Sequence, residues 1–186
     1  MYDNSTQLGN YIKYAQEEEN AWHVDIVAHN LGGLAARHYI HTFMQTYPDG
    51  RPQVSHLLLL GTPNLGSQCF DIYNATLNLA GTPVEAVRQM TQGHAIEFNR
   101  TVVNQKGVKF SALAGSEDSI LCGSVLPNDD VVSVASAIWR IKDNKTVNES
   151  HTDLLSPKNL NEFVKPRLAI GPKGNHNPAA PDLIDM

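Results

Sequence analysis

The stretch VDIVAHNLGGLAAR, Val24–Arg37, decides how this chain folds. It opens with a short β-branched and apolar run, Val24–Ala28, and continues into a segment of good helix formers. Between the two stand Asn30 and the glycines Gly32 and Gly33, and glycine leaves room for a sharp turn and for close packing. The stretch therefore predicts a strand, a tight corner and a helix.

The composition is that of an ordinary globular domain. At 186 residues the chain has the length of one domain and can bury a sizeable core. Its formal net charge of -5 gives neither nucleic acid nor an anionic membrane an electrostatic reason to bind. No apolar run approaches the roughly 20 residues that span a bilayer. Cys69 and Cys122 permit one disulfide at most, which the sequence leaves open, and no motif requires a metal or a cofactor.

The hydrophobic pattern of the whole chain predicts helices that alternate with strands. Leu8, Tyr11, Ile12 and Ala15 have helical spacing before the corner. The nearly continuous apolar run Val54–Leu60 is typical of a central parallel strand covered on both faces. We expect strands at 23–28, 54–60, 108–114 and within 138–148, and helices at 5–20, 31–46, 69–104 (divided at 81–83) and 159–169. This rhythm predicts an α/β fold with a doubly wound, mostly parallel sheet.

The corner resembles the nucleophile elbow of α/β-hydrolases, most closely the lipase and esterase form G-H-S-x-G-G. In that motif a serine sits on a strained strand-to-helix turn with its hydroxyl exposed above the sheet. Asn30 stands at the serine position, His29 at the packing or orienting position beside it, and Leu31 and Gly32 continue the elbow with its oxyanion amide. A carboxamide nitrogen is delocalised into its carbonyl, so a base cannot turn Asn30 into the nucleophile. The alternative is a plain strand–helix turn.

A second motif follows the next predicted strand. The segment GTPNLGS, Gly61–Ser67, resembles the G-T-P-x-x-G-S loop that follows the same strand in many lipases. The helical region at about 67–104 corresponds in those lipases to the cap or lid over the active site. Leu77, Val84 and Val87, together with Leu79 and Met90, could contact an acyl chain there, and simple packing is the other interpretation.

Two further segments resemble the parts of the family that carry the catalytic acid and histidine. The run PNDDVVSVASA, 127–137, is similar to N-D-G-V-V-P-V-x-S-A, whose aspartate orients the histidine. The match assigns the acid to Asp129, with Asp130 in place of the usual glycine, although two adjacent acids leave the assignment ambiguous. ESHTDLL, 149–155, resembles H-S-x-L-L and assigns the histidine to His151. The order of nucleophile, acid and histidine is that of the α/β-hydrolases.

The two ends of the chain carry expectations of their own. The resembling enzymes place several strands and an oxyanion loop before the elbow strand, so the resemblance implies a domain at 1–170 that is incomplete at its N-terminus. Residues 171–186 are rich in Pro, Gly and Asn and predict a disordered tail. Five Asn-x-Ser/Thr sequons indicate either a secreted or secretory-pathway glycoprotein or an asparagine-rich chain. The sequons begin at Asn4, Asn74, Asn99, Asn144 and Asn148.

Three hypotheses about function follow from the resemblance to hydrolases of carboxylic lipid esters. The first is a pseudoenzyme that binds an ester or acyl lipid, or regulates, without cleaving. The second is an active hydrolase in which Asn30 is replaced functionally or chemically, for example by conversion to an aspartate. The third is a truncated product without an independent fold. The expected partners are a small lipid or ester, a lipid surface in transient contact, and a second copy that pairs with an exposed sheet edge.

Overall fold

The sheet of this protein is parallel and has four strands. The computed structural model describes residues 2–117 and 127–170. The strands β1 (Val24–His29), β2 (Val54–Leu60), β3 (Lys109–Gly115) and β4 (Asp143–Val147) lie side by side in the order of the chain. Every neighbouring pair is parallel. The prediction of an α/β fold with a parallel sheet is therefore confirmed.

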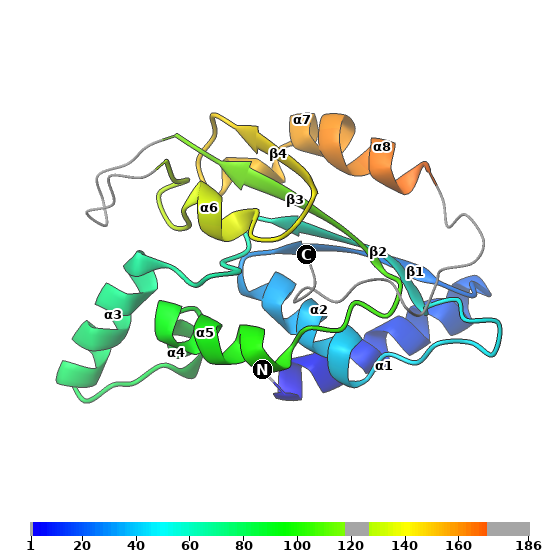
Figure 1. The fold of residues 1–186 in the computed structure, drawn as a ribbon, viewed down its shortest axis with the longest axis horizontal. Helices are drawn as coiled ribbons and strands as arrows, with labels where there is room; N and C mark the ends of the chain where they lie inside the picture. Colours follow the sequence, from blue (N-terminus) through cyan, green and yellow to red (C-terminus); the bar gives the residue numbers. More distant parts are fainter. Residues whose placement is uncertain (1, 118–126, 171–186) are drawn as a thin grey trace.

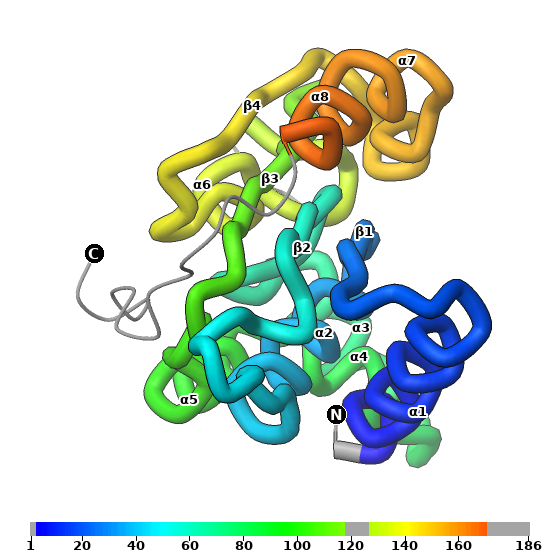
Figure 2. Tube along the Cα trace, turned by 90° about the vertical axis from the view of Figure 1, so that its right-hand side faces the viewer, coloured from blue at the N-terminus to red at the C-terminus, as the bar shows by residue number. Residues whose placement is uncertain are grey.

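Helices cover the sheet on both faces. The larger ones are α1 (Tyr2–Glu19), α2 (Leu31–Thr42), α3 (Gln68–Leu79) and α5 (Gln92–Thr101), and the shorter ones are α4 (Glu85–Gln89), α6 (Val134–Ala137), a 3-10 turn (Asp153–Leu155), α7 (Pro157–Asn159), a π-helical turn (Leu160–Val164) and α8 (Lys165–Leu168). Figure 1 and Figure 2 show α1 and α2 on one side of the strands and α7 and α8 on the other. This arrangement is the expected double winding.

The central strand β2 is buried along its whole length, as its apolar run predicts. Leu57 and Leu59 point to the face covered by α1 and α2 and belong to a core cluster with Ile40. Leu58 and Leu60 point to the opposite face and pack in a second cluster that includes Phe163. A strand buried on both faces needs apolar residues at successive positions, because alternate side chains enter different cores.

The observed boundaries differ from the expected ones at several helix ends. α1 begins three residues earlier than expected, at Tyr2, and the region expected to be helical to residue 104 is broken again between Gln89 and Gln92 and ends at Thr101. The helix expected to reach residue 46 ends at Thr42, because the amides of Phe43 and Met44 both donate to the Tyr39 carbonyl and Met44 turns into the core at 2% exposure. The closing helix begins two residues earlier than expected, at Pro157, where the Ser156 hydroxyl accepts from the third amide. The strands β1 and β3 are displaced by one residue.

Half of the apolar face expected on α1 is solvent-exposed. Ile12 is buried and Leu8 packs beside it, as predicted. The same prediction is wrong for Tyr11, which is 70% exposed, and for Ala15, which is also exposed. Helical spacing alone cannot tell which turns of a helix meet another element, and here α2 covers only the side that carries Ile12.

Two expectations concern segments outside the described residues. The tail at 171–186 is one of them. The other is the partner of Cys69, a residue at the start of α3 that is disulfide-bonded, because the only other cysteine of the chain, Cys122, lies in the undescribed part. Within residues 2–117 and 127–170, no helix combines the length and the apolarity needed to cross a membrane.

Candidate active site

The elbow between β1 and α2 holds Asn30 in an unusual backbone conformation. Its φ is 52° and its ψ is -129°, a sparsely populated combination for a residue with a side chain. The Asn30 amide donates to the Leu60 carbonyl at the end of β2, and its own carbonyl accepts from Gly33 at 3.1 Å. A Cβ on Gly33 would lie 2.1 Å from Thr62 Oγ1, so only glycine lets α2 start this close to the sheet.

Asn30, His151 and Asp129 form a continuous hydrogen-bonded line. His151 Nδ1 lies 2.8 Å from Asp129 Oδ2, and His151 Nε2 lies 2.9 Å from Asn30 Nδ2. Because an ionised carboxylate only accepts, the proton on Nδ1 is donated to Asp129, and Nε2 keeps its lone pair. That lone pair accepts an N–H of the Asn30 amide. The structure thus brings together the three residues that the sequence assigns to nucleophile position, acid and base.

Asp129 is the acid of this line, and its carboxylate is fully engaged. The residue is 0% exposed, and Oδ1 accepts from the amides of Val131 at 3.1 Å and Val132 at 2.7 Å. The His151 amide also donates to the Asp129 carbonyl. Asp130, the second acid of the ambiguous pair, takes a φ of 80° in the tight turn. It therefore holds the backbone position of the family glycine at the cost of left-handed strain.

His29 and Gly61 enclose the His151 ring. His29 Nε2 lies 3.0 Å from the His151 carbonyl, and the two ring centroids are 4.4 Å apart. Burial and then the neighbouring His151 lower the pKa of His29 below its ordinary value, which keeps it neutral and able to donate to that carbonyl. On the other side, a Cβ on Gly61 would lie 2.9 Å from the ring. The expected packing role of His29 agrees with this geometry.

Arg37 anchors the loop at 61–67, although no sequence motif marks it as a site residue. It is 2% exposed, and its guanidinium donates to Asn64 Oδ1 and Asn99 Oδ1, both at 2.8 Å. The guanidinium also lies 4.9 Å from the Phe98 ring centroid. Burial lowers the pKa of Arg37 to about 9. The available signal was an arginine on the apolar face of the elbow helix, one turn after Gly33.

The same hydrogen-bond network engages the asparagine of one sequon, Asn99. Asn99 uses both ends of its side-chain amide, because its oxygen accepts from Arg37 and its nitrogen donates to the Asn64 carbonyl at 2.7 Å. A glycan on this nitrogen would break the contact. Asn4, Asn144 and Asn148 lie exposed, and Asn74 is half-buried.

The loop at 61–67 is also tied to the segment that carries Asp129. The Ser136 hydroxyl donates to the Gly66 carbonyl at 2.7 Å and accepts from the Leu65 amide at 2.9 Å. The Ser67 hydroxyl donates to the Val131 carbonyl and accepts from the Cys69 amide, which caps α3. Hydrogen bonds therefore join the two motifs that resemble lipase segments.

The remaining predicted site residues divide into two groups. Leu31 and Gly32 are the first residues of α2, whose initial amides have no acceptor within the helix and suit an oxyanion. Leu77 and Val87 are half-buried and Val84 is 43% exposed. Figure 1 shows that α3 extends away from the sheet. The substrate-binding assignment of Leu77, Val84 and Val87 stays a prediction.

The site pairs a histidine with a buried carboxylate and with a side-chain amide. His151 is held by Asp129 as in an acyl-transfer site, but the group that its Nε2 meets is an amide. Asn30 Oδ1 is buried and has no hydrogen-bond donor among the described residues. The described part of the chain contains no cluster of three His, Cys, Asp or Glu side chains that could hold a metal ion.

The fold is the α/β-hydrolase fold, which the chain shares with solved structures of lipases and esterases. It is similar to the mature form of a Bacillus licheniformis lipase, with a TM-score of 0.73 and 20% identity over 89% of this chain and 73% of that chain. A metagenomic carboxyl esterase matches with a TM-score of 0.61 and 17% identity over 97% of this chain and 58% of that chain. Staphylococcus hyicus lipase matches with a TM-score of 0.55 and 12% identity over 79% of this chain and 70% of that chain. No family model and no curated protein matches the sequence.

Proposed function

We propose that this protein is a lipase-like hydrolase that has lost its nucleophile and uses the site to bind an ester or acyl lipid without cleaving it. One observation carries the proposal: the side-chain amide of Asn30 lies 2.9 Å from the base, His151 Nε2. In a serine hydrolase this nitrogen takes the proton of the attacking hydroxyl. Here it accepts a hydrogen bond from a group that it cannot activate.

The expected loss of rate is large. The nitrogen lone pair of a neutral carboxamide is delocalised into its carbonyl, so a histidine cannot activate that nitrogen for attack on an ester. Removal of the nucleophile alone from a site of this kind costs on the order of 10⁶ in rate, because the residues act as a unit. Direct activation of a water by His151 would compete with the Asn30 amide for the same lone pair. Both considerations favour binding over turnover.

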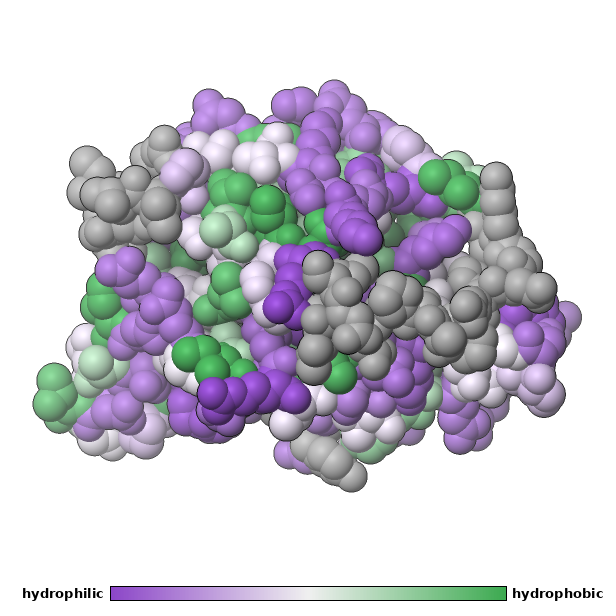
Figure 3. All heavy atoms as spheres, viewed as in Figure 1, coloured by the Kyte–Doolittle hydropathy of each residue, from purple (hydrophilic) through white to green (hydrophobic). Residues whose placement is uncertain are grey.

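The cap helices supply an apolar surface that suits a lipid. Ile72 and Tyr73 are 50% and 51% exposed, and Leu79 is 91% exposed. Figure 3 shows apolar atoms on the surface over α3, at the lower left. The nearby charges of α4 pair with each other, with Arg88 Nη2 2.6 Å from Glu85 Oε1. We infer that this surface makes transient contact with a lipid or its interface.

The test separates binding from cleavage. The protein is incubated with short p-nitrophenyl esters and with a serine-directed fluorophosphonate. We expect negligible turnover and no covalent label. In the same samples, saturation-transfer NMR should show contact of an intact short-chain ester with the protein, and His151→Ala should weaken that contact. Fluorophosphonate label at a serine of the loops at 61–67 or 127–137 would contradict the proposal, as would an ester that makes no contact at all.

Secretion and glycosylation remain predictions from the sequons. If the chain passes through a secretory pathway, the exposed Asn4 and Asn148 are the sites expected to carry glycans. Asn144 is exposed as well, but its amide nitrogen donates to the Ile141 carbonyl at 2.6 Å, and a glycan would break that contact. Asn99 is expected to stay bare in the folded protein, because its amide nitrogen donates to Asn64. Peptide mass mapping after secretion tests both statements.

A further inference from the structure

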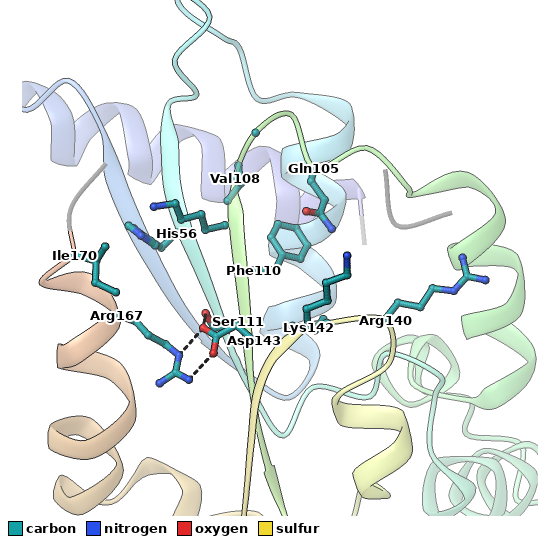
Figure 4. A pocket seen from close by; sticks show the side chains of 13 residues that line it. His56, Gln105, Val108, Phe110, Ser111, Arg140, Lys142, Asp143, Arg167 and Ile170 are labelled. Carbon is teal, nitrogen blue, oxygen red and sulfur yellow. Dashed lines mark hydrogen bonds and ion pairs between the residues drawn. The ribbon is translucent and has the colours of Figure 1, made fainter. Parts of the chain in front are cut away.

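A cavity opens at the end of the sheet opposite to His151. It lies where β3 and β4 begin, and its volume is about 380 Å³. Figure 4 shows its walls: residues at the start of β3, the segment that leads into β4, and the end of α8. Small-molecule sites have volumes from about 300 Å³ upward, so the cavity fits a ligand of modest size. The His151 line lies at the carboxyl ends of the strands and has no part in it.

The inner wall of the cavity combines apolar side chains with one unpaired donor. Val108, Phe110 and Ile141 supply the apolar part. Gln105 is 8% exposed, and its Nε2 has no acceptor in residues 2–117 or 127–170. A buried amide N–H without an acceptor costs free energy, and a ligand oxygen would relieve that cost.

The position of Gln105 is fixed by a tight turn. Its carbonyl accepts from the Val108 amide at 2.9 Å, and the two residues between them, Lys106 and Gly107, have φ values of 47° and 79°. Figure 4 shows the Gln105 side chain hanging from this turn into the space above Phe110. The donor is therefore presented to the cavity by the backbone and does not depend on a flexible loop.

Two ammonium groups at the same cavity have no carboxylate partner in residues 2–117 and 127–170. Most lysines and arginines of the described chain pair with a carboxylate: Lys13, Arg51, Arg88, Arg100, Lys145, Lys158 and Arg167. Lys109 and Lys142 line the cavity, and neither makes an ion pair with any residue that the structure describes. In Figure 4, Lys142 rises toward Gln105 and Phe110.

The acid of the cavity is already neutralised. Asp143 accepts from Arg167 Nε at 2.8 Å and Nη2 at 2.6 Å, and from the Ser111 hydroxyl at 2.6 Å. The Arg167 hydrogen bonds hold the pKa of Asp143 below its ordinary value. His56 faces the cavity with its Nδ1 engaged by Asp25 at 2.8 Å. Among the residues that the structure describes, Lys109 and Lys142 therefore give the cavity a positive charge that no carboxylate pairs.

From these features we propose that the cavity binds a small amphipathic carboxylate, such as a medium-chain fatty acid anion. Its carboxylate oxygens would accept from Gln105 Nε2 and meet the ammonium group of Lys142, and Lys109 would add positive charge from the other face of β3. Its hydrocarbon part would lie along Val108, Phe110 and Ile141. This site is separate from the elbow, so the proposal stands whether or not the elbow binds an ester.

The test uses octanoate and the full chain. In ¹⁵N-correlated NMR spectra, octanoate at millimolar concentration should shift the side-chain NH₂ of Gln105 and the amides of 107–111. Acetate, which lacks the apolar part, and octylammonium, which has the opposite charge, should shift them far less. Lys109→Gln combined with Lys142→Gln should weaken octanoate binding about threefold to tenfold, the effect of losing exposed ion pairs. Lys13→Gln, on α1, is the matched control and should leave binding unchanged.

Three results would overturn the proposal. The first is the absence of octanoate-dependent shifts in the wild-type protein. The second is equal binding by the Lys109→Gln/Lys142→Gln variant, since binding would then not depend on the proposed charges. The third is binding that appears only after Asp182→Asn and Asp185→Asn are introduced, because the occupant would then be the acidic C-terminal segment of the chain itself.

Discussion

The side-chain nitrogen of Asn30 lies 2.9 Å from Nε2 of His151, at the place where a serine hydrolase holds its attacking hydroxyl. The elbow conformation, the buried acid and the oriented imidazole are all present around this contact. The Asn30 amide donates a hydrogen bond to His151 Nε2 and thereby helps to hold the imidazole in its orientation. If the site has lost its nucleophile, as we propose, this hydrogen bond would keep the histidine ordered without one.

Asn30→Ser should restore the nucleophile but little turnover. The serine hydroxyl is one bond shorter than the asparagine amide, and His151 and Asp129 stay in place to activate it. Slow fluorophosphonate labelling that depends on His151 is therefore expected. The resemblance places the second oxyanion donor in a loop upstream of the elbow strand, and the described residues there form α1. If no other amide supplies this second donor, the transition state loses roughly 3 kcal/mol of stabilisation. Strong esterase activity of Asn30→Ser would show that another amide supplies that donor.

Asn30 itself should keep its amide. Conversion to an aspartate, the nucleophile of some other α/β-hydrolases, needs a water aimed at the side-chain carbonyl carbon. His151 Nε2 instead accepts from Nδ2, and Oδ1 is buried, so the base is not directed at such a water. We expect an unchanged mass for the peptide that contains Asn30 after prolonged incubation. A gain of about 1 Da, from NH₂ to OH, that disappears in His151→Ala would instead support the aspartate hypothesis.

Asp129→Asn should destabilise the fold by about 2–3 kcal/mol, because an amide offers one acceptor oxygen in place of two. Asp129 accepts from two backbone amides on one oxygen and from His151 on the other. Urea unfolding measures the change, and ¹⁵N spectra of the His151 ring report whether its proton leaves Nδ1. Asp153→Asn is the matched control at an exposed position and should stay within about 0.5 kcal/mol. Equal stability of the two variants would contradict the structural role of Asp129.

The glycines of the elbow should respond in opposite directions to alanine. Gly33→Ala would place a Cβ 2.1 Å from Thr62 Oγ1 and 2.7 Å from Leu59 Cδ2, and overpacking of this kind costs about 1–3 kcal/mol. A Cβ on Gly32 would meet nothing closer than Ala28 at 4.0 Å, and in a helix alanine is favoured over glycine by about 0.5–1 kcal/mol. Thermal denaturation of both variants is the measurement. A stabilising Gly33→Ala would mean that α2 sits farther from the sheet.

Features encoded in one stretch of chain could be predicted from the sequence. The apolar run of β2 matches its strand from Val54 to Leu60, because a strand buried on both faces needs no information from its neighbours. The corner at Asn30 could be predicted for a similar reason, since the small residues that it requires stand beside it. The contact between Asp129 and His151 was predicted only through the resemblance, because spacing does not reveal a pairing across a loop.

Features that depend on packing between distant segments could not be predicted. The network of Arg37, Asn64 and Asn99 joins α2, the loop at 61–67 and α5, and no local pattern marks its members as partners. The early end of α2 has the same origin, since Met44 leaves the helix to fill a core that other elements complete. Gln105 and Lys142 line the same cavity but lie in distant segments, and the hydrophobic pattern of each segment says nothing about the other.

The exposed edge of the sheet leads to the last prediction, self-association. β1 has β2 as its strand neighbour within the described chain, and its other edge is unpaired. Val27 on this strand is 47% exposed, so an apolar side chain accompanies the free backbone groups. An edge of this kind pairs readily with a second copy, and a lysine on the edge suppresses pairing. Sedimentation velocity should therefore show concentration-dependent dimers or larger species, and Val27→Lys should shift them toward monomer. Val84→Lys, a matched change at a 43% exposed valine outside the sheet, should not. A wild-type protein that stays monomeric at all concentrations and unfolds in one cooperative thermal transition would show that the β1 edge does not support pairing.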